Sequence, residues 1–145
     1  MQRLVVWADG STLNGSGWAV IVPTRKIIYR GNVTGATNQQ AELSAVIQAV
    51  FKFGPNIHII TDSKYTIGCF TDWYHNWLKN GWRNAKKKPV ENRQLIEIGL
   101  KLGANFCTYE HVKGHTGIKY NEMADWYAKG NQLKLEHSDW TLIQG

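Results

Sequence analysis

Residues 3–11 read RLVVWADGS, an arginine and five apolar residues that run into an acid and a glycine. A short apolar run followed by turn-forming residues is typical of a buried β-strand, so we expect a strand at residues 3–9. A second run, NIHIITD at residues 56–62, has the same form and also ends at an acid. If these two strands are neighbours, Asp9 and Asp62 lie together at the carboxyl ends of one sheet, where open α/β sheets place ligands.

The other elements follow from hydrophobic periodicity and from glycine and proline punctuation. In chain order we expect strands at residues 3–9, 17–22 and 26–34, a helix at 39–53, a strand at 56–61, helices at 63–71, 73–80 and 90–102, a strand at 105–112 and a helix at 121–135. Three leading strands favour an antiparallel meander, and the later alternation with helices predicts parallel crossovers. The expected class is therefore α/β with a mixed sheet, in a single domain over residues 1–145.

Composition narrows the class of protein further. A chain of 145 residues with 43% hydrophobic residues can bury a core of its own, which excludes wholesale disorder. The longest uninterrupted apolar run has five residues, whereas a membrane span needs about 20. Cys69 and Cys107 are far apart and show no metal-ligand or redox spacing. We therefore expect a cytoplasmic protein with reduced thiols and no membrane partner.

The net charge of +6 is concentrated in residues 73–93, here called the basic block. This block holds six basic residues against one acid, and three of the seven tryptophans. Basic groups interleaved with aromatic rings suit a nucleic-acid backbone and its sugar or base faces. The candidate contacts are Trp73, Trp77, Trp82, Lys86, Lys87 and Lys88. The alternative is a solvated, lysine-rich helix end with structural tryptophans.

Four acids from four separate elements are candidates for one site: Asp9, Glu42, Asp62 and Asp125. Each has an ordinary structural explanation, as a turn residue, a helix cap, a first-turn acid or a solvated helix acid. Together at one edge they would repel each other unless cations were present. Carboxylates with open coordination positions suit Mg²⁺ or Mn²⁺ better than zinc, and two such ions can promote phosphodiester cleavage.

A glycine-containing loop, VKGHTG at residues 112–117, precedes the last expected helix. Such a loop could bring His115 over a metal site, where its imidazole could transfer a proton. A solvent-exposed loop histidine without a role is the alternative interpretation.

Taken in order, these segments resemble type 1 ribonuclease H, from Val5 to about Lys129. The motifs that carry the resemblance are Asp9-Gly10-Ser11, Thr37-Asn38-Gln39-Gln40-Ala41-Glu42-Leu43, Thr61-Asp62-Ser63-Lys64-Tyr65, Val112-Lys113-Gly114-His115-Thr116-Gly117 and Asn121-Glu122-Met123-Ala124-Asp125. Each motif is weak by itself, but five in order at suitable spacings form a specific signal.

The resemblance implies a ribonuclease H-like fold, a five-stranded mixed sheet flanked by α-helices. It also implies an endonuclease that hydrolyses the RNA strand of RNA/DNA hybrids with two Mg²⁺ ions, for which Mn²⁺ can substitute. The four acids would be the metal ligands, with His115 assisting proton transfer or product release. We expect a monomer whose partner is the hybrid duplex.

The resemblance further implies how the substrate is held. The basic block looks like the protrusion that bacterial-type members use to hold the hybrid. Residues matching Thr37 and Asn76 grip a DNA-strand phosphate, Trp77 lines the DNA-strand groove, and Asn14, Asn38 and Gln39 reach the minor groove and the RNA 2′-hydroxyls. One departure is that Gly35-Ala36 precedes Thr37, where many relatives carry an arginine.

Three alternatives remain open from the sequence. The first is another nuclease of the same fold, such as an integrase, a transposase or a junction-resolving enzyme. The second is a hybrid-binding module without catalytic activity. The third is a basic nucleic-acid-binding domain whose acids only cap helices.

Overall fold

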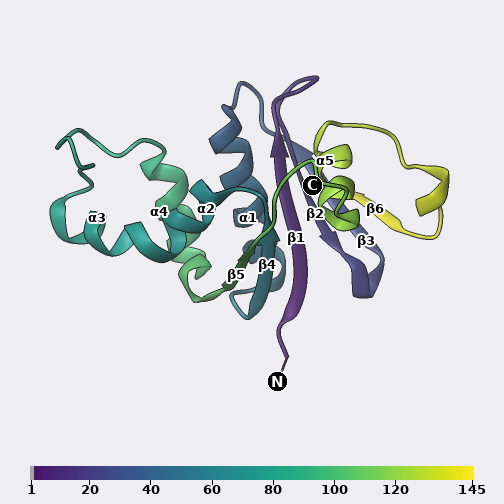
Figure 1. Cartoon of the computed structure of the whole chain (residues 1–145), viewed down its shortest axis with the longest axis horizontal. Coiled ribbons are helices and arrows are strands. Elements are labelled where there is room, and N and C mark those ends of the chain that lie inside the picture. Colours follow the sequence, from purple (N-terminus) through teal and green to yellow (C-terminus); the bar gives the residue numbers. More distant parts are fainter. Residues whose placement is uncertain (1) are drawn as a thin grey trace.

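The computed structural model describes residues 2–145 and is built around a six-stranded mixed sheet with the strand order β5-β4-β1-β2-β3-β6 (Figure 1). The strands are β1 Leu4–Ser11, β2 Gly17–Val22, β3 Ile27–Asn32, β4 Ile57–Thr61, β5 Thr108–His111 and β6 Thr141–Gln144. The helices are α1 Asn38–Phe53, α2 Lys64–Gly68, α3 Tyr74–Asn80, α4 Arg93–Leu102 and α5 Lys119–Ala128. The α/β class and the antiparallel meander of β1, β2 and β3 are confirmed.

The central strand, β1, joins the two halves of the sheet. It pairs antiparallel with β2 and parallel with β4, which in turn pairs parallel with β5. The expected end of this strand at Asp9 was too early, because Gly10 pairs with Trp18 and Ser11 with Gly17. Asp9 therefore lies inside a paired strand and not at the start of a turn.

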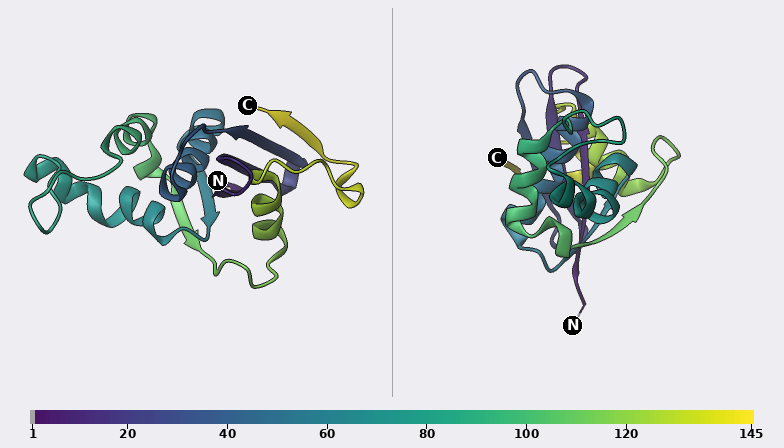
Figure 2. Two further views of the ribbon diagram at one scale, coloured as in Figure 1. Left: turned by 90° about the horizontal axis from the view of Figure 1, so that it is seen from above. Right: turned by 90° about the vertical axis from the view of Figure 1, so that its left-hand side faces the viewer.

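Different helices cover the two faces of the sheet (Figure 2). Alternating residues of β2 show the division. Val20 and Val22 belong to one buried cluster with the apolar face of α1, and Ala19 and Ile21 belong to a second cluster with α5. The strand period of two thus sends successive side chains into two separate cores.

The basic block extends from one end of the molecule. Residues 64–80 form one helical run, in which a π-helical stretch at Cys69–Trp73 joins α2 to α3, where two separate helices were expected. Gly81, with a φ of 75°, ends this run as predicted. Helix α4 begins at Arg93 and not at residue 90, because Asn92 is left-handed with a φ of 62°.

The C-terminal region differs most from the expectation. The last helix was expected to reach Leu135 but ends at Ala128, two residues before Gly130, which has a φ of 83°. The chain then returns to the sheet and forms β6, a sixth strand that pairs parallel with β3. The expected count of five strands was therefore one too low. Within residues 2–145, no helix combines the length and the apolar character that crossing a bilayer requires.

Candidate metal centre and nucleic-acid interface

Asp9 and Asp62 meet at one edge of the sheet, as the two strand ends predicted. The parallel register of β1 and β4 pairs Trp7 with Ile60, which brings the following residues of both strands to the same edge. Asp9 is only 4% exposed. Asp62 does not cap the next helix, because the Ser63 side chain performs that role by accepting from the Thr66 N–H. The capping explanation of Asp62 is therefore wrong.

Glu42 reaches the same edge from α1. The Gly10 N–H donates to Glu42 Oε1 at 2.6 Å, so the strand backbone holds the helix carboxylate. Gly10 permits this approach, because a Cβ at that position would collide with the backbone of Ala41 and Glu42. Since α1 begins at Asn38, Glu42 lies in its second turn, and the first-turn dipole explanation is wrong.

The three carboxylates form one cluster. Asp9, Glu42 and Asp62 each offer an oxygen, and these oxygens all lie within 4.8 Å of one another. Burial, followed by the hydrogen bond with Glu42 and the charges of the neighbouring acids, raises the pKa of Asp9 far above its usual range. Burial also raises the pKa of Glu42. Such crowding without a positive charge is unfavourable, and a set of oxygen donors fits a hard divalent cation.

Two residues that the sequence did not single out support Asp62. Asn121, on α5, is 3% exposed and donates through Nδ2 to Asp62 Oδ2 at 3.3 Å. Gly114 passes so close that a Cβ there would lie 2.7 Å from the same oxygen. Asn121 and Gly114 are not residue types that act as acids, bases or preferred metal ligands. Their contact with Asp62 could therefore be expected only from the motifs in which they stand.

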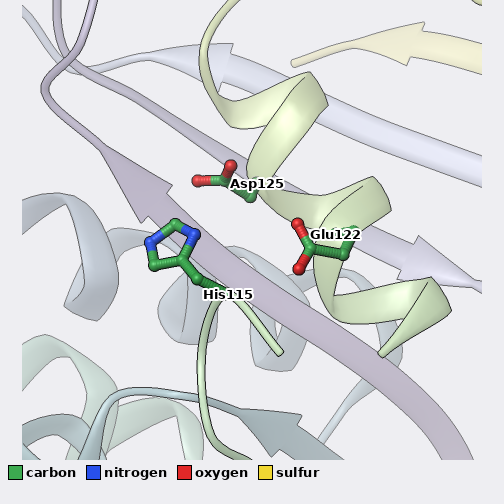
Figure 3. Close-up of side chains that lie close together, drawn as sticks. All are labelled: His115, Glu122 and Asp125. Atoms are coloured by element: carbon green, nitrogen blue, oxygen red, sulfur yellow. The ribbon is translucent and has the colours of Figure 1, made fainter. Parts of the chain in front are cut away.

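His115, Glu122 and Asp125 form a second group next to the first (Figure 3). One ligand atom from each lies within 4.8 Å of the others, and His115 extends from the loop towards the two acids of α5. The negative charge of Asp125 is one of the smaller causes that raise the pKa of Asp9. Asp125 also pairs with Lys129 at 2.7 Å. Glu122 is not among the four candidate acids of the sequence, where it appears only within a motif.

The start of α1 provides polar groups beside this edge. Thr37 is the N-cap, as expected for a helix start, and forms a reciprocal capping box with Gln40. The Thr12 hydroxyl donates to Asn38 Oδ1 at 2.6 Å. A surface hollow is lined by Thr37, Asn38, Gln39, Gln40, Glu91 and Asn92. Asn76 does not line it. Asn92, which was not among the residues selected from the sequence, lines this hollow together with Thr37. Its backbone is left-handed, with a φ of 62°, and its side-chain Oδ1 accepts from Gln40 Nε2 at 3.2 Å.

A second hollow lies on the basic block and holds Asn76. It is lined by Trp73, Asn76, Trp77, Lys79, Asn80, Arg83, Asn84 and Ala85. A smaller hollow shares Gln39 with the α1 hollow and Trp73 and Trp77 with this one, so the three hollows are neighbours on the surface. Trp82 is only 5% exposed and stacks on Trp77 at 5.8 Å, so its ring supports the wall and offers no free face.

The remaining predicted contacts are exposed. Lys86, Lys87 and Lys88 lie on a turn in which Asn84 Oδ1 accepts from two of their backbone N–H groups. Asn14 is exposed in the β1–β2 turn with a φ of 59°. A further hollow at the tip of β1 is lined by Leu13 and by His115 and Asp125, and Asn14 does not line it.

Comparisons with known proteins identify the family of this chain. The family model for RNase H matches residues 1–132. Ribonuclease H of Wolbachia pipientis wMel is 36% identical over 137 residues, covering 88% of this chain and 94% of that protein. Ribonuclease H of Ehrlichia chaffeensis is 36% identical over 143 residues, covering 92% of this chain and 97% of that protein.

Solved structures share the fold. A foamy viral protease-reverse transcriptase in complex with dsDNA is 24% identical with a TM-score of 0.62, and the match covers 86% of this chain and 94% of that chain. The foamy viral protein in complex with RNA/DNA hybrid has a TM-score of 0.59 at 24% identity, over 83% of this chain and 18% of that chain. From the family match and the relatives, the chain belongs to the ribonuclease H family, whose members are endoribonucleases acting on RNA/DNA hybrids.

Proposed function

We propose that Asp9, Glu42, Asp62 and Asp125 hold two divalent metal ions and that hydrolysis of the RNA strand of a hybrid takes place at this edge of the sheet. The observation that carries the proposal is the mutual approach of three carboxylates within 4.8 Å, one of them buried, on the fold of this family. The all-oxygen donor set favours Mg²⁺, with Mn²⁺ as a substitute. Ions of this kind, held by these carboxylates, would supply positive charge that stabilises phosphodiester cleavage.

The chain's own residues orient the reaction and move protons. Gly10 and Asn121 hold Glu42 and Asp62 in place through the hydrogen bonds described above. His115 is exposed on a loop whose neighbouring residues include Gly114 and Gly117, and its ring faces Asp125 and Glu122. We assign to His115 proton transfer to the leaving oxygen or assistance in product release.

The three neighbouring hollows support a binding mode for the duplex. Thr37 and Asn92 lie together and could hold a DNA-strand phosphate near the start of α1. Asn38 and Gln39 would face the minor groove, with Asn14 as a further contact. Trp73, Trp77 and Asn76 would line the DNA-strand side, and Lys86, Lys87 and Lys88 would attract the backbone from the turn. The foamy viral relative solved with an RNA/DNA hybrid agrees with this class of partner. In this proposal the whole chain acts as one domain and as a monomer.

The test uses end-labelled RNA/DNA hybrid, RNA duplex, DNA duplex and single strands of one sequence. We expect cleavage of the hybrid in MgCl₂, internal cuts confined to the RNA strand, and no cleavage in EDTA. Cleavage of the DNA duplex would favour another nuclease of the same fold. Binding of the hybrid without cleavage in either MgCl₂ or MnCl₂ would favour a binding module.

A further inference from the structure

The C-terminal segment, residues 131–145, follows α5 and lies almost wholly beyond the part of the chain that matches the family model. Figure 1 shows this segment in yellow, returning to the sheet edge where β6 pairs with β3. Trp140 and Leu142 pack against the buried cluster that α5 forms with the sheet. The segment therefore contacts the helix that carries Asp125.

His137 is the point where this segment enters the core. It is 7% exposed, and its ring lies between Tyr127 of α5 and Trp140, with centroid distances of 5.7 and 6.0 Å. Its Nδ1 is 2.8 Å from the hydroxyl oxygen of Tyr127, which is itself 1% exposed. A buried polar pair thus joins the segment to α5, two residues from Asp125.

The hydrogen bonds around Tyr127 select the neutral form of His137. The Tyr127 oxygen accepts from the Lys134 N–H at 3.1 Å, and among the hydrogen bonds of residues 2–145 His137 Nδ1 is the only partner placed to accept the Tyr127 hydroxyl hydrogen, so we assign this donation to Tyr127. An imidazolium ring carries hydrogens on both nitrogens and cannot accept this bond. Protonation would therefore leave a buried hydroxyl hydrogen without its partner, which is costly.

The charges around the ring are mixed. Glu136 and Asp139 favour a proton on His137, whereas Lys134 of the same segment and Lys119 of α5 disfavour it. Asp139 is already paired with Lys26 from the sheet side. Burial is the largest influence, and the pKa of His137 is lowered from its ordinary value.

We propose that His137 is a positioning residue for the metal centre. Its neutral ring fastens the C-terminal segment to α5, a contact here called the lock, and so holds Asp125 at the carboxylate edge, the sheet edge that carries Asp9, Glu42 and Asp62. Protonation of His137 releases this lock. The inference rests on the proposed role of Asp125. When the segment is released, His137 binds a proton at pH values below its ordinary pKa of about 6.5, whereas the buried ring of the locked segment resists protonation. The equilibrium constant that favours the locked state is therefore at its full value above that pH, and it falls by up to about tenfold for each pH unit below it.

Amide hydrogen exchange of residues 119–128 and 141–144 tests the lock, measured at pH 7.5 and pH 5.5 and corrected for intrinsic rates. We expect the wild type to lose up to about tenfold in protection at pH 5.5. His137→Gln keeps a neutral acceptor, so its protection should not show this loss. Tyr127→Phe removes the hydroxyl and should also reduce the pH dependence, which keeps the test valid if His137→Gln folds poorly. His75→Gln, an exposed histidine on α3, should behave as the wild type.

Calorimetric titration with MnCl₂ at the same two pH values links the lock to the metal centre. Protonation of the carboxylates weakens binding in all variants, so the additional loss in the wild type relative to His137→Gln measures the lock. Equal pH dependence of exchange in the wild type, His137→Gln and Tyr127→Phe would overturn the proposal. If Asp125→Asn binds MnCl₂ as tightly as the wild type, the proposed role of Asp125 is wrong, whatever the exchange data show.

Discussion

The carboxylate edge and the basic block hold their functional groups in different ways. Asp9 is buried in a paired strand, and Glu42 is held by a backbone N–H of that same strand. In the basic block, Lys86, Lys87 and Lys88 are exposed on a turn held by local hydrogen bonds, two of them to Asn84 Oδ1. Metal chemistry requires fixed positions, whereas attraction of a phosphate backbone tolerates mobile charges. A single change should therefore be severe at the edge and mild in the block.

The largest expected effect is at the edge itself. Asp9→Asn or Asp62→Asn should abolish cleavage of the hybrid, because each removes a charged metal ligand from the cluster. The measurement is single-turnover cleavage at saturating MgCl₂, with Asp72→Asn, an exposed aspartate outside the cluster, as the control. Turnover close to that of the wild type in either cluster variant would show that the residue is not a ligand.

An intermediate effect is expected for His115, which lies near the edge but on an exposed loop. His115→Ala should lower kcat by about 10²-fold, within the range for one general acid or base, and change KM little. Steady-state kinetics on the hybrid separates the two parameters. A raised KM with an unchanged kcat would mean that His115 binds substrate and does not assist the chemistry.

A smaller effect is expected in the basic block. Replacing Lys86, Lys87 and Lys88 with Ala should raise KM and leave kcat nearly unchanged. The slope of log affinity against log salt should fall by up to about 0.9 for each lost phosphate contact. Lys101→Ala, a lysine on α4 outside the block, is the matched control. An unchanged slope in the triple variant would show that the three lysines face solvent in the complex.

Trp77 tests whether the block also reads the DNA strand. A ribose 2′-hydroxyl pressed against this ring would lose hydration without gaining a partner, at a cost of roughly 1–3 kcal/mol. Trp77→Ala should therefore narrow the ratio of kcat/KM between hybrid and RNA duplex. Leu78→Ala, an exposed neighbour on the same helix, should leave the ratio unchanged. If Trp77→Ala also leaves it unchanged, selectivity comes from helix shape or from Asn38 and Gln39.

The smallest expected effect concerns stability, and its direction is opposite to the effect on activity. The pKa of Asp9 is raised in the folded chain, so above about pH 4 the unfolded chain releases a proton that the folded chain retains. Without metal, this costs the wild type stability as the pH rises. Asp9→Asn should raise Tm by several degrees at pH 7, because each kcal/mol of unfolding free energy shifts the Tm of a chain of this size by about 3–5 °C. At pH 3.5 the gain should be small. Saturating MgCl₂ should reduce the gain, because the ions stabilise the folded wild type. A Tm gain that is equal at both pH values would contradict this origin.

Most of the fold was predictable because its elements carry local signals. The apolar runs of β1 and β4 and the apolar periodicity of α1 indicated their positions to within one or two residues. The errors fall where a local signal was weak. The end of α5 depends on Gly130, and β6 exists only because an open edge of β3 pairs with it.

The candidate site was predictable in its acids but not in its supports. Asp9 and Asp62 could be paired because both end apolar runs that the sheet places side by side. Asn92 could not be found from the chain, because its position in the hollow that Thr37 lines depends on a left-handed residue and on the folding of the whole basic block. The sequence alone did not distinguish Trp82 from Trp77 as a candidate contact, and only the structure shows that Trp82 is buried.

The sequence by itself determined the α/β class, the order of the central elements, the family and the choice of four candidate acids, because short-range patterns and motif spacing encode these features. Only the tertiary structure decided which groups support them. The contact of Gly10 with Glu42, the bond from Asn121 to Asp62 and the burial of His137 against Tyr127 join residues that are distant in the chain. Such contacts depend on how separate elements pack, and no local preference of a single residue specifies them.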